Sequence, residues 1–290
     1  MANTLSTYSL RHKYFSVNLQ QALRNALVAE KICKVERSEL KTIENPYITA
    51  TTATIQAVAG TYTTNAMTTT DDALSVNDEV WDATHVYEFE KLTANFNLIS
   101  DFLDELIYRV KEKIDIFVLN KVLDIATETY TTAAGGFNTA SNIPKIIGDL
   151  LGKVAGYASG VAANPFLVIE STEITGFVQL QVGSGFNYAD AALNNGFMAN
   201  YAGVKIYCVR TGVFQTATIG TLTATNSGHR LFGLTGLALY ASPRDVSYKE
   251  IDVPAGAGTG RFGKEVVAVG YIGATIWVPL RSLFVDITLA

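Results

Sequence analysis

The stretch from residue 42 to residue 127 constrains the fold most, because a segment without basic residues leads straight into a long helical pattern. Residues 42–90 contain no Lys or Arg and eight Asp or Glu residues. The first half of this segment is rich in Thr, whose β-branched side chain favours strands. From about residue 97 to residue 127, apolar side chains recur at helical spacing: Ile99, Phe102, Leu103, Leu106, Val110, Ile114 and Phe117. We therefore expect an extended acidic arm joined to a rigid helical rod.

Within the arm, two runs of residues are expected to form strands. Ile48–Val58 is enriched in β-branched residues, and His85–Leu92 alternates between apolar and polar side chains over several residues. The polar residues around Asp71 and Asp72 are expected to form the turn region between these strands. About 30 helical residues at about 1.5 Å each would give the rod that follows a length on the order of 45 Å.

The rest of the chain alternates helix and strand signals, which indicates an α+β fold. Helices are expected at residues 16–34, 143–157, 171–181 (with Ser171 as the N-cap) and 188–193. Strands are expected at residues 165–170, 204–210, 237–241, 246–253, 266–278 and 283–289.

The composition argues that partners cover part of the surface. Charged residues make up 17% of the chain and hydrophobic residues 48%, whereas about 25% charged residues are usual in soluble domains. A compact, apolar-rich monomer is the alternative that fits the same numbers. The net charge of −5 and the lack of a basic patch argue against direct binding of nucleic acid. A container could still enclose nucleic acid without gripping it.

The motifs predict no cofactor, no metal site and no membrane anchor. Cys33 and Cys208 lie far apart without a CxxC pattern, which fits a reducing compartment. The three His residues show no metal-ligand spacing: His12, His85 and His229. The longest apolar run, residues 266–280, is interrupted by glycines and is too short to span a bilayer. The first residues show no signal-peptide pattern.

One Gly-rich stretch, residues 258–265, nearly matches a phosphate-binding P-loop. That motif requires Ser or Thr after its Lys and a helix after the loop. Glu265 follows Lys264 instead, and a strand pattern comes next, so we expect a Gly-rich turn between two strands. The arm acids likewise lack the regular spacing and central Gly of an EF-hand calcium loop. A solvated acidic edge, or one paired with another subunit, is favoured, and no catalytic residue is predicted.

The order of these parts resembles the major capsid proteins of tailed double-stranded-DNA bacteriophages, which have the Hong Kong 97 phage fold. Residues 91–106 resemble the exit of a hairpin and the start of a spine helix, and Gly203–Ile206 resembles an axial-domain strand. His229–Gly233 through Leu239 and Gly270–Ala274 resemble the late strands of that family. The resemblance covers nearly the whole chain, and it depends on the order of the segments rather than on one specific motif.

The resemblance implies an α+β, Hong Kong 97-type capsid fold with an N-terminal arm, an extended β-hairpin (the E-loop), a long spine helix in a peripheral domain, and an α/β axial domain. The expected parts are the N-terminal arm and helix (1–40), the E-loop (41–95), the peripheral domain (96–140 and 237–279) and the axial domain (141–236 and 280–290).

The resemblance also implies a structural protein without enzyme activity, whose copies form the hexamers and pentamers of an icosahedral shell around the phage genome. The expected partners are other copies of the chain, a scaffolding protein, a portal and a decoration protein. The shell would enclose double-stranded DNA without binding it specifically. The protein would be found in the virion, and in the host cytoplasm during assembly.

The mechanism implied by the resemblance places the hairpin of one subunit across the spine helix of its neighbour. We expect hairpin acids to meet bases of the adjacent chain, with the Gly-rich tip as a second contact. The candidate residues are Asp71, Asp72, Asp78, Glu79, Arg109, Lys111, Lys113, Arg261 and Lys264.

Two departures from the family pattern have consequences. Residues 42–90 of the hairpin segment contain no Lys, so the Lys–Asn isopeptide cross-link of some relatives is not expected. The N-terminal arm is short, which implies a separate scaffolding protein or prior removal of a scaffolding region. An encapsulin, a bacterial nanocompartment shell protein with the same fold, is the alternative, although the polar start fits a phage shell better. A Thr-rich adhesin and a P-loop enzyme are weaker alternatives.

Overall fold

The computed structural model of the chain describes residues 24, 27–38, 41–48, 53, 55, 60, 67–87, 98–155, 164–184, 197–253 and 263–290. Contacts between Cα atoms divide the chain into two units. The first unit comprises residues 1–24, 81–110 and 246–269, and the second comprises residues 25–80, 111–245 and 270–290. Three elements contribute residues to both units: β4 (Asp78–Tyr87), α4 (Leu98–Ile125) and β14 (Gly263–Ile276).

The second unit is built on a six-stranded sheet. Its strand order is β5 (Glu128–Thr131), β15 (Val285–Thr288), β11 (His229–Leu234), β6 (Pro165–Glu170), β8 (Val204–Val209) and β7 (Phe197–Tyr201). β6 is buried along its whole length, as expected for a central strand covered on both faces. It runs parallel to β8 and antiparallel to β11.

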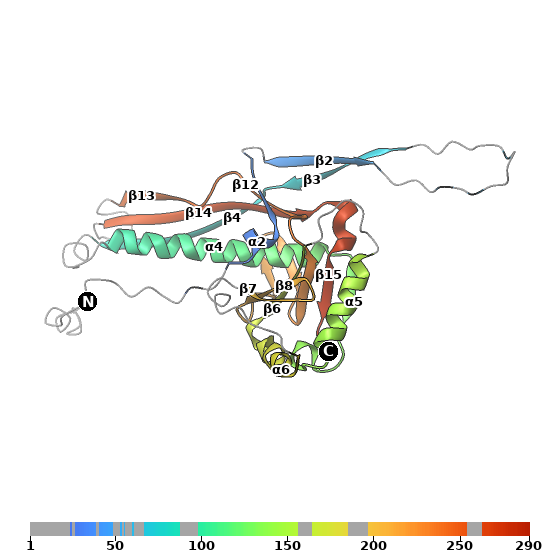
Figure 1. The fold of residues 1–290 in the computed structure, drawn as a ribbon. Helices are drawn as coiled ribbons and strands as arrows, with labels where there is room; N and C mark the ends of the chain where they lie inside the picture. Colours follow the sequence, from blue (N-terminus) through green and yellow to red (C-terminus); the bar gives the residue numbers. More distant parts are fainter. Residues whose placement is uncertain are drawn as a thin grey trace. The chain divides into compact units, whose positions relative to one another are not determined.

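Two helices, α5 (Ile143–Ala155) and α6 (Ile174–Ser184), pack on this sheet (Figure 1). The buried side chains of α5 recur every three or four residues, which gives the helix one apolar face. That face belongs to the same cluster as Leu167 and Ile169, two alternate residues of β6. The rings of Phe137 and Phe177 stack in this cluster with their centroids 6.0 Å apart. Because alternate strand residues share a face, one side of the sheet holds this core.

The helix α4 confirms the predicted rod. It has 28 residues, which corresponds to about 42 Å at about 1.5 Å per residue. In its second half, which belongs to the second unit, Asn120 is fully buried. The Asn120 amide donates to the carbonyl oxygen of Val213 at 2.8 Å, and its Oδ1 accepts from Asn226 at 3.2 Å. This buried amide is therefore hydrogen-bonded rather than left unsatisfied.

The segment from Val28 to Arg37 is tied into the second unit at several points. The short helix α2 (Ala29–Ile32) is followed by β1 (Lys34–Arg37), which pairs in parallel with β12 (Ala238–Ser242). The backbone N–H groups of Val28 and Ala29 donate to Oδ1 of Asp115 on α4 at 2.8 and 2.6 Å. Of the helix predicted from residue 16 to about residue 34, residues 16–23, 25 and 26 lie outside the described residues. The end at Ile32 is close to the predicted one, but residues 24, 27 and 28 are not helical, so the helix is not continuous over that range.

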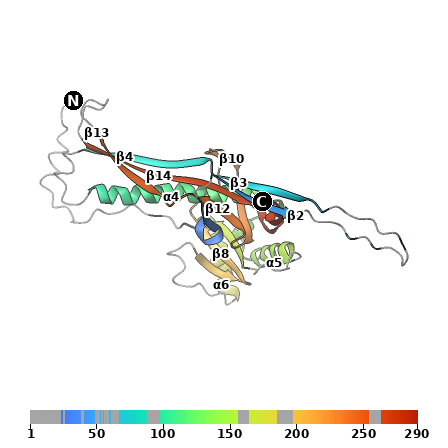
Figure 2. The same cartoon turned by 90° about the horizontal axis from the view of Figure 1, so that it is seen from above.

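In the first unit, β13 (Ser247–Val253) pairs antiparallel with the first half of β14 (Figures 1 and 2). In the second unit, the end of β14 pairs antiparallel with β12. The stretch before β14 lies outside the described residues. A strand follows it and not a helix, which agrees with the rejection of a P-loop.

The arm forms a hairpin. Of the strand predicted at Ile48–Val58, Ile48 is in a strand, residues 53 and 55 are not, and the other residues lie outside the described part of the chain. β2 (Thr42–Ile48) pairs antiparallel with β3 (Thr69–Ser75), so that Pro46 lies opposite Asp71 and Asn45 opposite Asp72. The expectation that these acids form the turn was wrong, because both lie inside β3. Residues 85–87 are extended as predicted, but they belong to β4, which pairs with β14. A second hairpin, β9 (Thr216–Ile219) and β10 (Leu222–Thr225), had not been predicted.

Most other predicted elements agree with the structure. The N-cap before α6 differs: Glu170, not Ser171, accepts the capping hydrogen bond, and Glu173 completes the box from the short 3₁₀ helix η2 (Ser171–Glu173). The helix expected at residues 188–193 lies outside the described residues. Within the described part of the chain, no helix is long and apolar enough to cross a membrane.

Candidate interaction surfaces

The β2–β3 ribbon is the first candidate surface. In the described part of the chain, β2 and β3 pair only with each other, so the outer edge of each strand has no described strand beside it. The side chains of Ile48 and Met67 are 65% and 72% exposed. A hairpin of two strands is marginally stable by itself in water. The ribbon therefore combines open strand edges with exposed apolar side chains, a combination typical of a surface that a partner covers.

Four arm acids were predicted to contact another subunit, and the structure divides them into two pairs. Asp71 and Glu79 are exposed, and neither forms an ion pair with any residue that the structure describes. The carboxylate of Asp72 accepts from the backbone N–H of Val278 at 2.9 Å. The carboxylate of Asp78 accepts from the N–H and the hydroxyl of Thr221, both at 2.7 Å. Asp72 and Asp78 thus have partners inside their own chain.

Two of the predicted basic residues on α4 have acidic neighbours outside the arm. Arg109 forms an ion pair with Glu105 at 2.8 Å, one turn earlier on α4. Lys111 approaches Asp245 at 3.6 Å, while Lys113 is exposed.

Lys264 forms an ion pair with Glu250 on the neighbouring strand β13 at 2.9 Å. Arg261 lies outside the described residues. Contact between the arm acids and these bases across a subunit boundary therefore stays a prediction.

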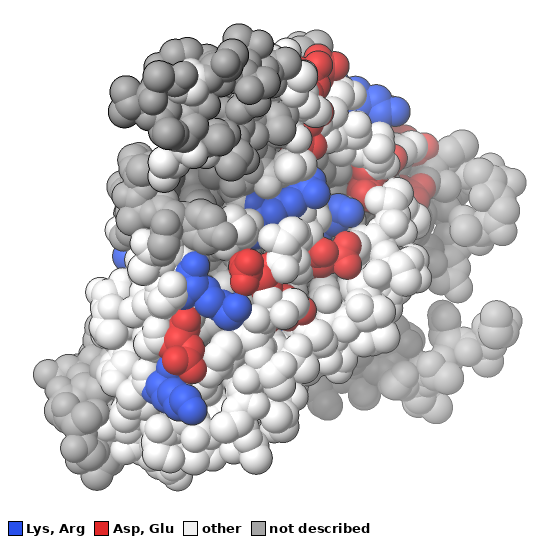
Figure 3. Space-filling model, turned by 90° about the vertical axis from the view of Figure 1, so that its right-hand side faces the viewer, with Lys and Arg blue, Asp and Glu red and all other residues white. Residues whose placement is uncertain are grey.

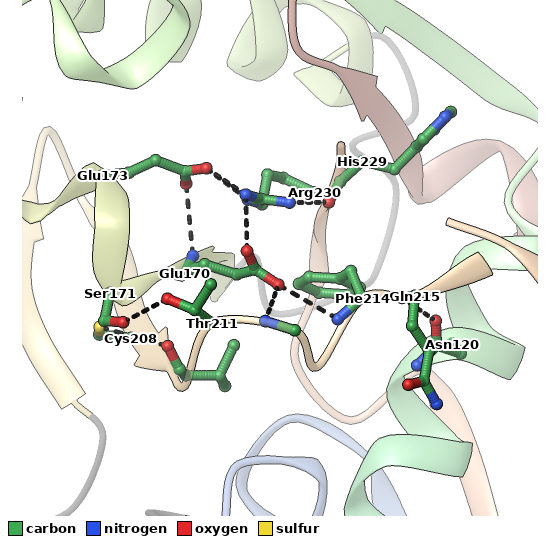
Figure 4. Close-up of polar contacts among 12 residues, drawn as sticks. Asn120, Glu170, Ser171, Glu173, Cys208, Thr211, Phe214, Gln215, His229 and Arg230 are labelled. Atoms are coloured by element: carbon green, nitrogen blue, oxygen red, sulfur yellow. Dashed lines mark hydrogen bonds and ion pairs between the residues drawn. The ribbon is translucent and has the colours of Figure 1, made fainter. Parts of the chain in front are cut away.

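A buried polar cluster at the end of β6 is the second candidate site (Figure 4). The guanidinium of Arg230 donates to Glu173 at 2.6 Å and to Glu170 at 3.0 Å. The other oxygen of Glu170 accepts from the backbone N–H groups of Gly212 and Phe214 at 3.0 and 3.3 Å. Burial raises the pKa of Glu173, and its hydrogen bond with Arg230 opposes that shift.

This cluster is suited to holding the fold together. Glu170, Glu173 and Arg230 are 6%, 1% and 4% exposed, and their contacts join β6, β11 and the loop after β8. Burial raises the pKa of the nearby Cys208 thiol to about 11, so the thiol stays protonated and is a poor nucleophile. Among the described residues there is no group of His, Cys, Asp and Glu that could hold a metal ion.

The face drawn in Figure 3 carries basic and acidic side chains in alternation rather than a patch of one sign. Charged groups are also paired between α5 and β5, where Lys153 lies 3.1 Å from Glu128. Proteins that grip nucleic acid gather Lys and Arg on one face. On the face in view, no such concentration is seen among the described residues.

Sequence reasoning missed the chain's own partners of Asp72 and Asp78. Thr221 lies 143 positions after Asp78, and Val278 lies 206 positions after Asp72, so local patterns could not identify them. A signal was nevertheless present. Asp72, Leu74, Val76 and Asp78 occupy every second position, which places them on one face of an extended chain.

The sequence matches no family model and no curated protein. Solved structures do resemble it. The capsid structure of cyanophage P-SCSP1u matches with a TM-score of 0.73 at 13% identity, covering 97% of this chain and 94% of that one.

The mature capsid of bacteriophage PhiM1 gives a TM-score of 0.69 at 10% identity, covering 96% of this chain and 91% of that chain. The capsid of Myoviridae phage XM1 gives 0.65 at 15% identity, covering 100% and 99%. The chain therefore has the mixed helix and sheet fold of phage capsid proteins over nearly its full length.

Proposed function

We propose that this chain is the major capsid protein of a tailed double-stranded-DNA bacteriophage. Many copies form the hexamers and pentamers of an icosahedral shell around the genome. The observation that carries the proposal is the likeness in fold to capsid structures, which covers nearly the whole of this chain and of the chains compared. None of the structures named above is an encapsulin, so they give the nanocompartment alternative no support.

The elements can be assigned to the parts of a Hong Kong 97-type fold. The β2–β3 hairpin corresponds to the E-loop (41–95), and α4 to the spine helix of the peripheral domain (96–140 and 237–279). The six-stranded sheet corresponds to the axial domain (141–236 and 280–290), and residues 1–40 to the N-terminal arm and helix. β5, at Glu128–Thr131, adds a strand to that sheet from ahead of the proposed axial boundary.

The hairpin of one subunit lies across the spine helix of its neighbour in this proposal. Asp71 and Glu79, the exposed arm acids, are oriented toward bases such as Lys113 of the adjacent chain. An exposed ion pair contributes about 0–1 kcal/mol, so apolar contacts made by side chains such as Ile48 and Met67 must supply most of the affinity. Multivalent repetition around a shell makes weak contacts effective.

The charge distribution suits a container. With a net charge of −5, the shell encloses double-stranded DNA without gripping it, since strong binding requires clustered Lys and Arg. A scaffolding protein, a portal and a decoration protein are the further partners proposed. Assembly takes place in the host cytoplasm, and the product is the virion shell.

Negative-stain electron microscopy tests the proposal. The protein would be expressed alone and together with a candidate scaffolding protein from the same genome. Closed shells or rings of capsomers in either preparation are the expected result. A strictly monomeric protein in both preparations would count against the proposal and would reopen the adhesin and enzyme alternatives.

A further inference from the structure

Where β3 leads into β4, one face of the chain carries four inward side chains in a row. The side chain of Asp72 is 14% exposed, and Leu74, Val76 and Asp78 are 3%, 9% and 9% exposed. The residues between them are exposed, as alternation along an extended chain requires. Residues 72–78 thus turn two apolar side chains inward, with a carboxylate on either side of them. We call this row the anchor stripe.

The apolar middle of the anchor stripe packs on β12 and β14. Leu74 and Val76 form a buried cluster with Leu239 and Ala241 of β12. The backbone comes so close to β14 that a Cβ on Gly273 would lie 2.7 Å from the carbonyl oxygen of Ser75. This contact holds the segment down, but apolar packing is not directional. By itself it would allow the ribbon to pivot about Leu74 and Val76.

The carboxylate of Asp72 fixes one side of this pivot. It accepts from the N–H of Val278 at 2.9 Å, at the start of the short helix η4 (Val278–Leu283). The guanidinium of Arg281 lies 3.8 Å from the same carboxylate oxygen. Hydrogen bonds to a carboxylate have a preferred direction and are stronger than neutral ones.

The carboxylate of Asp78 fixes the other side. Both of its oxygens accept hydrogen bonds from Thr221, one from the backbone N–H and one from the hydroxyl. The carboxylate also lies directly against the backbone of Gly220, whose φ of +61° forms the turn between β9 and β10. A side chain at residue 220 would collide with the carboxylate, so the fit between Asp78 and this hairpin is tight.

We infer that Asp72 and Asp78 are positioning residues that set the direction in which the β2–β3 ribbon leaves its subunit. One carboxylate binds η4 and the other binds the β9–β10 turn, on either side of the apolar pivot. A swing of the ribbon must break at least one of these contacts. The two acids therefore hold the ribbon in one direction before assembly. Binding to the adjacent subunit then does not have to pay the entropy cost of ordering the ribbon. This consequence for assembly rests on the proposed function, whereas the orientation itself does not.

Distance measurements on the unassembled subunit test the orientation. Spin labels would be attached at Ile48→Cys on the ribbon and Thr129→Cys on β5, in a Cys208→Ser background, and their separation measured by pulsed electron paramagnetic resonance. Asp72→Ala and Asp78→Ala are the test variants. Asp71→Ala and Glu79→Ala are matched controls, because they remove an adjacent acid that points outward.

The parent and both controls should give one narrow distance distribution, and the two test variants a broad one. The backbone amides of β2 and β3 should also exchange with solvent roughly tenfold faster in the test variants, since losing a hydrogen bond to a charged group weakens the anchor. Thr221→Val removes only one hydroxyl and replaces Asp78→Ala if that variant does not fold. Unchanged distributions in the folded test variants would overturn the inference.

Electron microscopy of the same variants tests the consequence for assembly. Fewer closed shells from Asp72→Ala and Asp78→Ala than from the parent are expected. Normal yields from both variants would refute that consequence. If the parent protein itself forms no shells, the proposed function fails, and the distance distributions still decide the orientation.

Discussion

The side chain of Asp115 shows how one buried carboxylate can hold a segment of chain. It is 6% exposed, and its Oδ1 accepts two backbone hydrogen bonds from Val28 and Ala29. Burial raises its pKa to about 6, although these two hydrogen bonds act to lower it. Nearby Glu30 also raises the pKa, whereas Lys31 lowers it. Burial of the charge outweighs the hydrogen bonds, so the folded chain binds a proton here more tightly than the unfolded chain does.

This pKa predicts a pH dependence of stability whose sign is opposite to that of a salt-bridged acid. The ordinary pKa of 3.8 applies to the unfolded chain, and about 6 to the folded one. The free energy of unfolding should therefore fall as pH rises through this window, by up to roughly 3 kcal/mol. Urea unfolding of the unassembled subunit between pH 4 and pH 7 would measure it. Asp115→Asn keeps an acceptor oxygen without titrating, so it should lose this component, and an identical pH profile in both proteins would contradict the assignment.

At the scale of elements, α5 carries two glycines on its open face. Gly148 and Gly152 are exposed, and a Cβ at either position would meet nothing within 4 Å. Glycine inside a helix is less favourable than alanine by about 0.5–1 kcal/mol, because the unfolded chain has more freedom to lose. Gly148→Ala and Gly152→Ala should each raise the free energy of unfolding of the unassembled subunit by about this amount. Thermal or urea denaturation would measure it.

Gly176 on α6 provides the contrasting control. A Cβ there would collide with the carbonyl oxygen of Phe137, so Gly176→Ala should destabilise the subunit although it makes the same chemical change in a helix. Destabilisation by Gly148→Ala would show that the face of α5 is not open in the isolated subunit.

Elements governed by local periodicity were predictable from the sequence, and strand pairing was not. The apolar spacing of α4 and the unbroken apolar run of β6 gave nearly correct boundaries, because both patterns report burial directly. The hairpin was paired wrongly, because Asp71 and Asp72 are unfavourable strand residues and resembled a turn. Asp72 lies in β3 because η4 supplies its partners, Val278 and Arg281. Contacts at that separation in sequence leave no local pattern.

The same limit applied to the candidate site. The sequence identified the charged residues of the arm and of α4. It could not show that Asp72 and Asp78 accept hydrogen bonds from their own chain, whereas Asp71 and Glu79 are exposed. Burial decides between these pairs, and burial depends on the fold. The alternation from Asp72 to Asp78 was the available signal for the inward pair.

At the scale of the whole molecule, the stability of the fold and the association of subunits depend on different parts of the chain. The core of the second unit is closed by α5, α6 and the six-stranded sheet, whereas the β2–β3 ribbon has open edges and exposed apolar side chains. Substitutions at exposed ribbon positions should therefore leave folding unchanged and alter association. Surface substitutions away from structural contacts usually change stability by about 0.5 kcal/mol or less.

A charge exchange would test whether an exposed arm acid meets α4 of another copy. Asp71→Lys should lower the yield of closed shells, because it places like charges together wherever Asp71 meets a base of the neighbour, and that repulsion recurs at every copy of the interface. If Lys113 is the base, adding Lys113→Glu should restore the yield, since the pair is then reversed rather than removed. Asp124→Lys, which changes the net charge equally at an exposed position outside the ribbon, should leave the yield near that of the parent. Shell yields would be compared by sedimentation and electron microscopy at low and high salt, where screening weakens an exposed pair. A double variant no better than Asp71→Lys would exclude Lys113 as the partner, and normal shells from Asp71→Lys would exclude Asp71 from the interface.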